Sequence, residues 1–126
     1  MKKILLTLSV VVIGVAAYLF YQDKSKTSIV DIDSNQTKVG FVYLTTPGDH
    51  GWTYAHELGK QKVEKHFGEN VKISVVENVP EGPDATRVIR ELAKQGNEII
   101  FTTSFGYMDP TLKVAKEFPN IKFEHI

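Results

Sequence analysis

Four short segments with the character of β-strands alternate with segments of helical periodicity in the larger part of this chain. They cover residues 38–44, 71–76, 98–103 and 121–126, and each has the length of a β-strand. Within the first, residues 39–44 are continuously apolar, which is typical of a strand covered on both faces of its sheet. The segments between these expected strands have helical spacing, so the expected order is β-α-β-α-β-α-β.

The first two expected helices have recognisable ends. The first begins near Trp52 and ends at Gly68, which can adopt a positive φ there. Its apolar positions form one stripe: Trp52, Ala55, Gly59, Val63 and Phe67. The second begins at Pro83 and stops at Gly96, with its apolar positions at Ala85, Val88, Ile89 and Leu92.

The third expected helix begins at an Asp-Pro pair. Asp109 is the expected N-cap, and Pro110 occupies the first helical position, where its missing N–H does no harm. Its expected apolar face consists of Leu112, Ala115 and Phe118, and Pro119 closes the helix.

This alternation predicts an α/β fold, with a parallel sheet and helices on both of its faces. Such a sheet most often has strand order 2-1-3-4, and ligands bind beyond the carboxyl ends of the strands, at the switch point between strands 1 and 3. The loops bordering that point are residues 45–52 and 102–109, which are rich in glycine, hydroxyl, carboxylate and aromatic groups. Topology and composition therefore predict the same ligand cleft.

The N-terminal residues are not expected to belong to the fold. Residues 1–21 contain two lysines at positions 2 and 3 and an uncharged apolar run at 4–20, which predicts a secretory signal or a short membrane anchor. We favour cleavage after Ala16 or Ala17, although an uncleaved helix would keep the chain at the inner membrane. Residues 22–37 have linker composition, and residues 38–126 form the expected domain. The chain contains no cysteine, so it has neither a disulfide nor a site for a lipid anchor on cysteine.

The charge balance excludes some kinds of partner. Fifteen basic residues face fifteen acidic ones, giving a formal net charge of zero. Proteins that bind nucleic acid or anionic membranes without further specificity use a basic field, which this chain does not have. We therefore expect no nucleic-acid partner.

Asp49 and Trp52 are the first candidate site residues. A tryptophan at the mouth of a cleft offers a flat apolar face for stacking a ring, and a carboxylate accepts hydrogen bonds from ligand hydroxyl or amino groups. Each residue alone is better explained as a helix N-cap and a core side chain, respectively. Their joint position at a predicted switch point favours the ligand-binding interpretation.

The second candidate group is Ser104, Phe105, Gly106 and Asp109. Gly106 would let the backbone approach a ligand, while Ser104 and nearby backbone N–H groups would donate to a ligand acceptor. Phe105 adds ring surface, and Asp109 is better explained as the helix cap. The segment 77–83, which follows the second strand, could line the rim, but we prefer to interpret it as a polar turn.

Catalytic and metal sites are not predicted. His50 and His56 are six residues apart, which is not the spacing of a helical metal pair, and no cofactor is expected. Phosphate-binding, dinucleotide-binding and serine-nucleophile motifs are absent from the sequence, so we do not expect an enzyme.

Five ordered blocks carry a resemblance to a known family. They begin at Val39, Gly48, Val76, Ile100 and Phe118, and read VGFVY, GDHGWTYAH, VENVPEGPDA, IFTTSFGYMD and FPNIKFEH. In this order and spacing they resemble the basic membrane protein family, the substrate-binding components of ABC transporters for purine nucleosides or related bases. The resemblance covers residues 38–126.

The resemblance implies the first part of lobe 1 of a type I periplasmic-binding-protein fold, in which two lobes close on a ligand. Family members stack a purine on aromatic rings and bind its polar groups with aspartate and serine. By position, the matching residues are Asp49, Trp52, Ser104, Phe105, Gly106 and Asp109. The Gly-Trp pair of the first loop resembles a subgroup with adenine-like ligands. The implied partners are a purine and a transporter permease, and the implied location is the periplasm or cell envelope.

The length of the chain departs from the family. Members run to about three hundred residues, as two lobes of ordinary domain size require, so we expect a truncated or partial form. Two alternatives remain, a membrane-anchored sensor or interaction module that uses the same lobe, and, ranked last, a small α/β enzyme.

Overall fold

A computed structural model describes residues 36–126, which form a four-stranded sheet with three α-helices. The strands are β1 (Thr37–Val42), β2 (Val71–Val76), β3 (Ile99–Thr102) and β4 (Lys122–His125). All neighbouring strands are parallel, and their order is β2-β1-β3-β4. Both the α/β class and the 2-1-3-4 order expected from the sequence are therefore confirmed.

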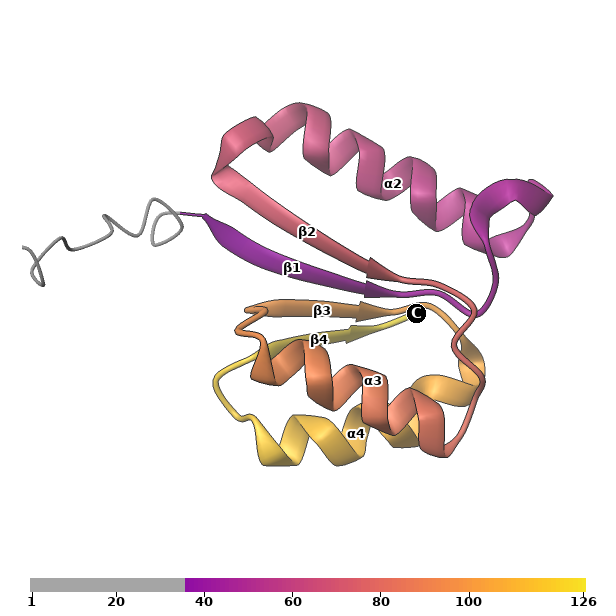
Figure 1. Cartoon of the computed structure of the whole chain (residues 1–126), viewed down its shortest axis with the longest axis vertical. Coiled ribbons are helices and arrows are strands. Elements are labelled where there is room, and N and C mark those ends of the chain that lie inside the picture. Colours follow the sequence, from indigo (N-terminus) through magenta and orange to yellow (C-terminus); the bar gives the residue numbers. More distant parts are fainter. Residues whose placement is uncertain (1–35) are drawn as a thin grey trace, which may run out of the picture. The chain divides into compact units, whose positions relative to one another are not determined.

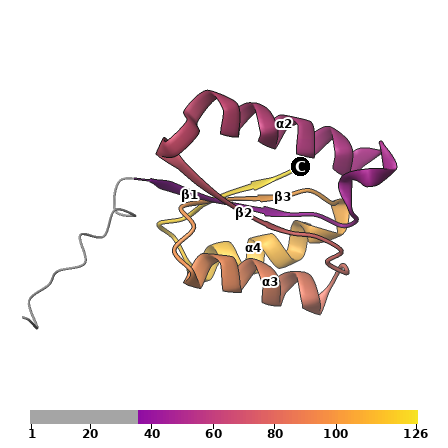
Figure 2. The same ribbon diagram turned by 45° about the horizontal axis from the view of Figure 1, so that its top comes forward.

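The helices lie on both faces of the sheet. They are α2 (Trp52–Phe67), α3 (Pro83–Lys94) and α4 (Met108–Glu117). Figures 1 and 2 show α2 over one face, with α3 and α4 side by side over the other. Three short 3-10 turns, Pro47–Asp49, Gly68–Asn70 and Phe105–Tyr107, lie in the connections. Gly68 and Gly96, expected as helix stops, both have positive φ.

The strands bury side chains on both faces of the sheet. One core lies against α3 and α4, where Val42 and Ile100 are fully buried with Ile89 and Val114. The other lies on the opposite face and contains Val39, Phe41 and Tyr43, with the ring of Phe41 stacked on Phe101. Burial on both faces explains why the first strand is apolar without alternation.

The apolar stripe predicted for the first helix does not form its inner face. Trp52 is 58% exposed and Phe67 is 48% exposed, whereas the buried residue of α2 is Thr53. A polar contact accounts for this orientation of α2. The hydroxyl of Tyr43, a buried residue that follows β1, donates to the carboxylate of Glu57, which also forms a salt bridge with Lys60. The helix therefore turns this carboxylate toward the sheet.

The ionisation of this polar group follows from its contacts. Burial acts to raise the pKa of Glu57, but hydrogen bonds from Gln61, Lys60 and Tyr43 outweigh it, so this pKa is lowered. Burial and the nearby Glu57 both raise the pKa of Tyr43. The Glu57 carboxylate is therefore stabilised in its charged form beneath α2.

The start of the last helix also differs from the prediction. Asp109 is not the N-cap, because α4 begins at Met108, directly after the 3-10 turn of residues 105–107, and the N-cap position is Tyr107. The earlier start anchors the helix through the buried Tyr107 ring. The buried face is then Pro110, Thr111 and Val114, while Leu112, expected in the core, is 55% exposed.

The predictions for the N-terminal residues concern a part of the chain that the structure does not describe. The signal or anchor at 1–21 and most of the linker at 22–37 lie outside the described residues, so these boundaries stay predictions. Within residues 36–126, no helix is long and apolar enough to cross a membrane.

Substitutions on α4 test which face of this helix is buried in the core. We expect Val114→Ala to lower the free energy of unfolding by about 2 kcal/mol, because it opens a cavity in the core. Leu112→Ala should change it by less than about 0.5 kcal/mol, because that side chain is mostly in solvent. Urea denaturation followed by circular dichroism measures both. A larger loss for Leu112→Ala than for Val114→Ala would contradict the observed buried face.

Candidate ligand site at the carboxyl ends of the strands

The first and third strands are tied together just beyond their ends. The backbone N–H of Thr103 donates to the carbonyl of Val42 at 3.1 Å, and the Thr103 hydroxyl donates to the same oxygen at 3.0 Å. Both residues are fully buried. This joint fixes the positions from which the two predicted loops leave the sheet at the switch point.

Trp52 connects the first loop to the third strand. Its indole N–H donates to the carbonyl of Thr103 at 2.9 Å, while more than half of the side chain remains exposed. The neighbouring hydroxyls of Thr45 and Thr53 lie 2.8 Å apart in hydrogen-bonding contact. The ring is thus held by its nitrogen and open to solvent, so the alternative of a core tryptophan is wrong.

Asp49 lies in the first loop, in the turn Pro47–Asp49. The N-cap position of α2 is Gly51, so Asp49 does not cap that helix. The turn ends at His50, whose φ of 54° is left-handed. This placement puts the Asp49 backbone in the loop that leads to Trp52, as the sequence predicted.

Ser104 and Gly106 donate to a residue that sequence reasoning left out of the site. The Ser104 hydroxyl donates to Oε1 of Glu81 at 2.6 Å, and the Gly106 N–H donates to the same oxygen at 3.1 Å. Ser104 is 5% exposed, whereas Glu81 is exposed. The serine hydroxyl and the glycine N–H, which we expected to face a ligand, are therefore used within the protein.

The segment that carries Glu81 is a third loop of the site. The N–H of Val79 donates to the carbonyl of Tyr43 at 3.1 Å, and the Tyr107 hydroxyl donates to the carbonyl of Val79 at 2.6 Å. Burial, together with the nearby Glu81, raises the pKa of Tyr107 to about 12. Our interpretation of residues 77–83 as a plain turn was incomplete. The signal was topological, because β2 borders β1 and ends at the same edge.

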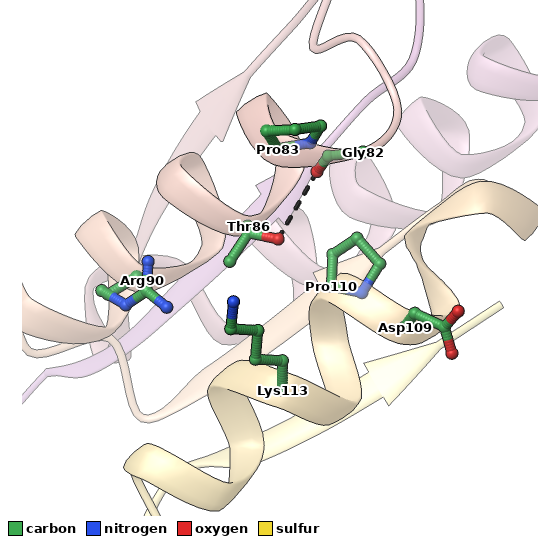
Figure 3. A pocket seen from close by; sticks show the side chains of 7 residues that line it. All are labelled: Gly82, Pro83, Thr86, Arg90, Asp109, Pro110 and Lys113. Atoms are coloured by element: carbon green, nitrogen blue, oxygen red, sulfur yellow. Dashed lines mark hydrogen bonds between the residues drawn. The ribbon is translucent and has the colours of Figure 1, made fainter.

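The side chains of Phe105 and Asp109 make no hydrogen bond within residues 36–126. Phe105 is 82% exposed, and Asp109 is exposed in the first turn of α4. Asp109 lies at the edge of a hollow of about 440 Å³ between α3 and α4, which Arg90 and Lys113 also line (Figure 3). The structure thus leaves Phe105 exposed next to Ser104 and places Asp109 on the hollow between α3 and α4.

Two histidines adjoin the site. A ring nitrogen of His125, at the end of β4, lies 2.9 Å from the carbonyl of Ser104. The ring of His56 meets Trp52 edge to face at 4.7 Å, and its buried Nε2 has no hydrogen-bond partner within residues 36–126. Burial lowers the pKa of His56. In residues 36–126 no group of three histidine, cysteine or acidic residues could hold a metal ion.

Comparison with known proteins identifies the family. Residues 36–126 match the family model Bmp, described as ABC transporter substrate-binding protein PnrA-like. The chain belongs to this family. It is a family of transporter substrate-binding proteins and not a class of enzymes. Such proteins act outside the cytoplasm, bind small molecules and work with permeases.

Two curated proteins are similar in sequence to this chain. A purine-binding protein of Brucella abortus is 56% identical over 88 residues, which are 70% of this chain and 25% of the relative. A candidate ABC transporter glucose-binding protein of Haloferax volcanii is 32% identical over 93 residues, 74% of this chain and 23% of the relative. The chain therefore spans about a quarter of the length of these relatives.

Solved structures of transporter solute-binding proteins share the fold. One from Conexibacter woesei has a TM-score of 0.60 at 24% identity. The aligned region covers 69% of this chain and 28% of that protein. Another from Aeropyrum pernix has a TM-score of 0.58 at 19% identity, with coverages of 70% and 24%. These likenesses support the assignment of the fold as part of a periplasmic solute-binding protein.

The partly buried His56 predicts a pH dependence of the free energy of unfolding. Because its pKa in the folded state is lowered from 6.5, the unfolded state takes up a proton first as the pH falls. The contribution of neutral His56 to the free energy of unfolding is complete above pH 6.5 and is lost as the pH falls toward the folded-state pKa. We therefore expect the free energy of unfolding, measured by urea denaturation, to fall less between pH 7.5 and pH 5.5 for His56→Gln than for the wild type.

His66→Gln is the control for this experiment, because His66 lies on the same helix and is exposed. Its free energy of unfolding should fall with pH as much as that of the wild type. An equal fall for the wild type and His56→Gln would show that His56 is not the responsible group.

Proposed function

We propose that this chain supplies the first-lobe part of a receptor that captures a purine base or nucleoside for an ABC transporter. The observation that carries the proposal is the state of Trp52. Its nitrogen is fixed on Thr103 and its ring is open at the switch point. A ring held in this way loses little freedom when a flat heterocycle stacks on it.

The relatives support a purine over a sugar. The Brucella abortus protein, 56% identical, is named for purine binding, whereas the Haloferax volcanii protein, 32% identical, is named for glucose binding. Aromatic faces stack with both kinds of ligand, so glucose is the proper competitor in a test. Adenine is our favoured purine, on the Gly51-Trp52 pair of the first loop.

In this proposal, Asp49, Trp52, Ser104, Phe105 and Gly106 form the lobe's half of the ligand site. Trp52 stacks on the ligand, and Phe105, which is exposed beside Ser104, provides further ring surface. Ser104 and Gly106 shape the second loop through Glu81 rather than through the ligand. Asp109 is the least supported member, since it lines the hollow between the helices.

The location and partners follow from the same proposal. The apolar run at residues 4–20 directs export, with residues 1–21 as signal or anchor and 38–126 as the partial lobe. The receptor then works in the periplasm or at the inner membrane and delivers its ligand to a permease. A sensor that uses the same lobe is the second candidate, and retention of the N-terminal segment on the membrane would favour it.

Trp52 provides the test, because it is the only tryptophan in the sequence. Titration with adenine should quench its fluorescence in a saturable way, whereas glucose at the same concentrations should leave it unchanged. Asp49→Asn should weaken the adenine response about tenfold if this carboxylate accepts a ligand hydrogen bond. Saturable quenching by glucose without a response to adenine would contradict the purine proposal.

A further inference from the structure

The Glu81 carboxylate has one oxygen engaged and one available. Its Oε1 accepts from both Ser104 and Gly106, at 2.6 Å and 3.1 Å. In the described part of the chain, Oε2 of Glu81 has no hydrogen-bond partner, and the residue is exposed. The segment 77–83 thus presents an acceptor to solvent beside the second loop, from which the sequence had predicted donors to a ligand.

Gly106 makes room for this carboxylate. A Cβ atom at position 106 would overlap the carboxyl group of Glu81, whereas other glycines of the site loops, such as Gly48, have open space around them. The absence of a side chain at Gly106 therefore lets Glu81 approach its backbone N–H. The prediction that a ligand would occupy this space is not needed to explain the glycine.

Short contacts connect Glu81 to the stacking surface. Trp52 donates to the carbonyl of Thr103, and Thr103 is followed by Ser104, which donates to Glu81. Trp52 and Glu81 are therefore bound to two consecutive residues of the second loop, Thr103 and Ser104. The buried Ser104 hydroxyl lies behind the carboxylate.

We propose that Glu81 is a specificity-determining residue that accepts a hydrogen bond from an N–H group at the edge of the ligand. This inference rests on the proposed function and deepens it. It selects purines with an exocyclic amino group. A ligand without a donor at that edge would strip water from the carboxylate without replacing its hydrogen bond, which is costly.

Adenine and 6-methylpurine form a matched pair for the test. The amino and methyl groups have similar size, but only the amino group donates. Hydrogen bonds to charged groups contribute about 1.5–3 kcal/mol, which corresponds to a preference for adenine of roughly 10- to 100-fold. Binding to the chain of residues 1–126 is followed by the indole N–H resonance of Trp52 in ¹H–¹⁵N spectra, which also detects weak binding.

Glu81→Gln is the decisive variant. The side-chain carbonyl can still accept from Ser104 and Gly106, while the amide NH₂ replaces the free oxygen with a donor. We expect the preference for adenine to fall below about threefold. Glu77→Gln is the matched control, because it removes the same charge from the same loop and Glu77 makes no hydrogen bond in residues 36–126. It should keep the wild-type preference.

Gly106→Ala is an independent variant that keeps every charge. Its methyl group should displace the Glu81 carboxylate, so the adenine preference should fall although Glu81 remains. An undiminished preference in both Glu81→Gln and Gly106→Ala, with adenine still bound, would overturn the inference and leave the proposed function intact. Absence of any response of the wild type to either base would overturn the proposed function and the inference with it.

Discussion

The joint between Thr103 and Val42 is the constraint on which the rest of the site depends. Two donors of Thr103 converge on one carbonyl and hold the ends of β1 and β3 together. The carbonyl of Thr103 then points to Trp52, and the next residue, Ser104, is turned toward Glu81. Because the connections that follow β1 and β3 lead to helices on opposite faces of the sheet, such a tie holds the starts of the two loops together (Figure 1).

Local chemistry was sufficient to predict the order of the elements along the chain. Short segments of strand length between turn residues mark the strands, and glycines with positive φ mark helix ends, so β2 and the stop at Gly68 were predicted within a residue. The rule for strand order then placed the first and second loops side by side, and the Trp52–Thr103 bond joins them.

The failures have a common cause, since each involves a polar partner distant in sequence. Periodicity assigns α2 by apolar content, but the Tyr43 hydroxyl draws Glu57 inward and turns the stripe of Trp52 outward. Glu81 reaches a residue 23 positions away, and no local pattern marks that contact. Tyr107 likewise anchors α4 through the carbonyl of Val79, which shifted the helix from its expected start.

Affinity and selectivity have different origins in such a site. Pockets that bind small molecules tightly bury most of the ligand surface, and the chain spans about a quarter of its relatives' length. The described residues therefore offer one face to the proposed ligand, and tight binding requires further surface. Selectivity needs only a fixed group of the right polarity, and the Oε1 atom of Glu81 is held by Ser104 and Gly106. The proposed preference between two purines can thus be measured even where the affinity for both is low.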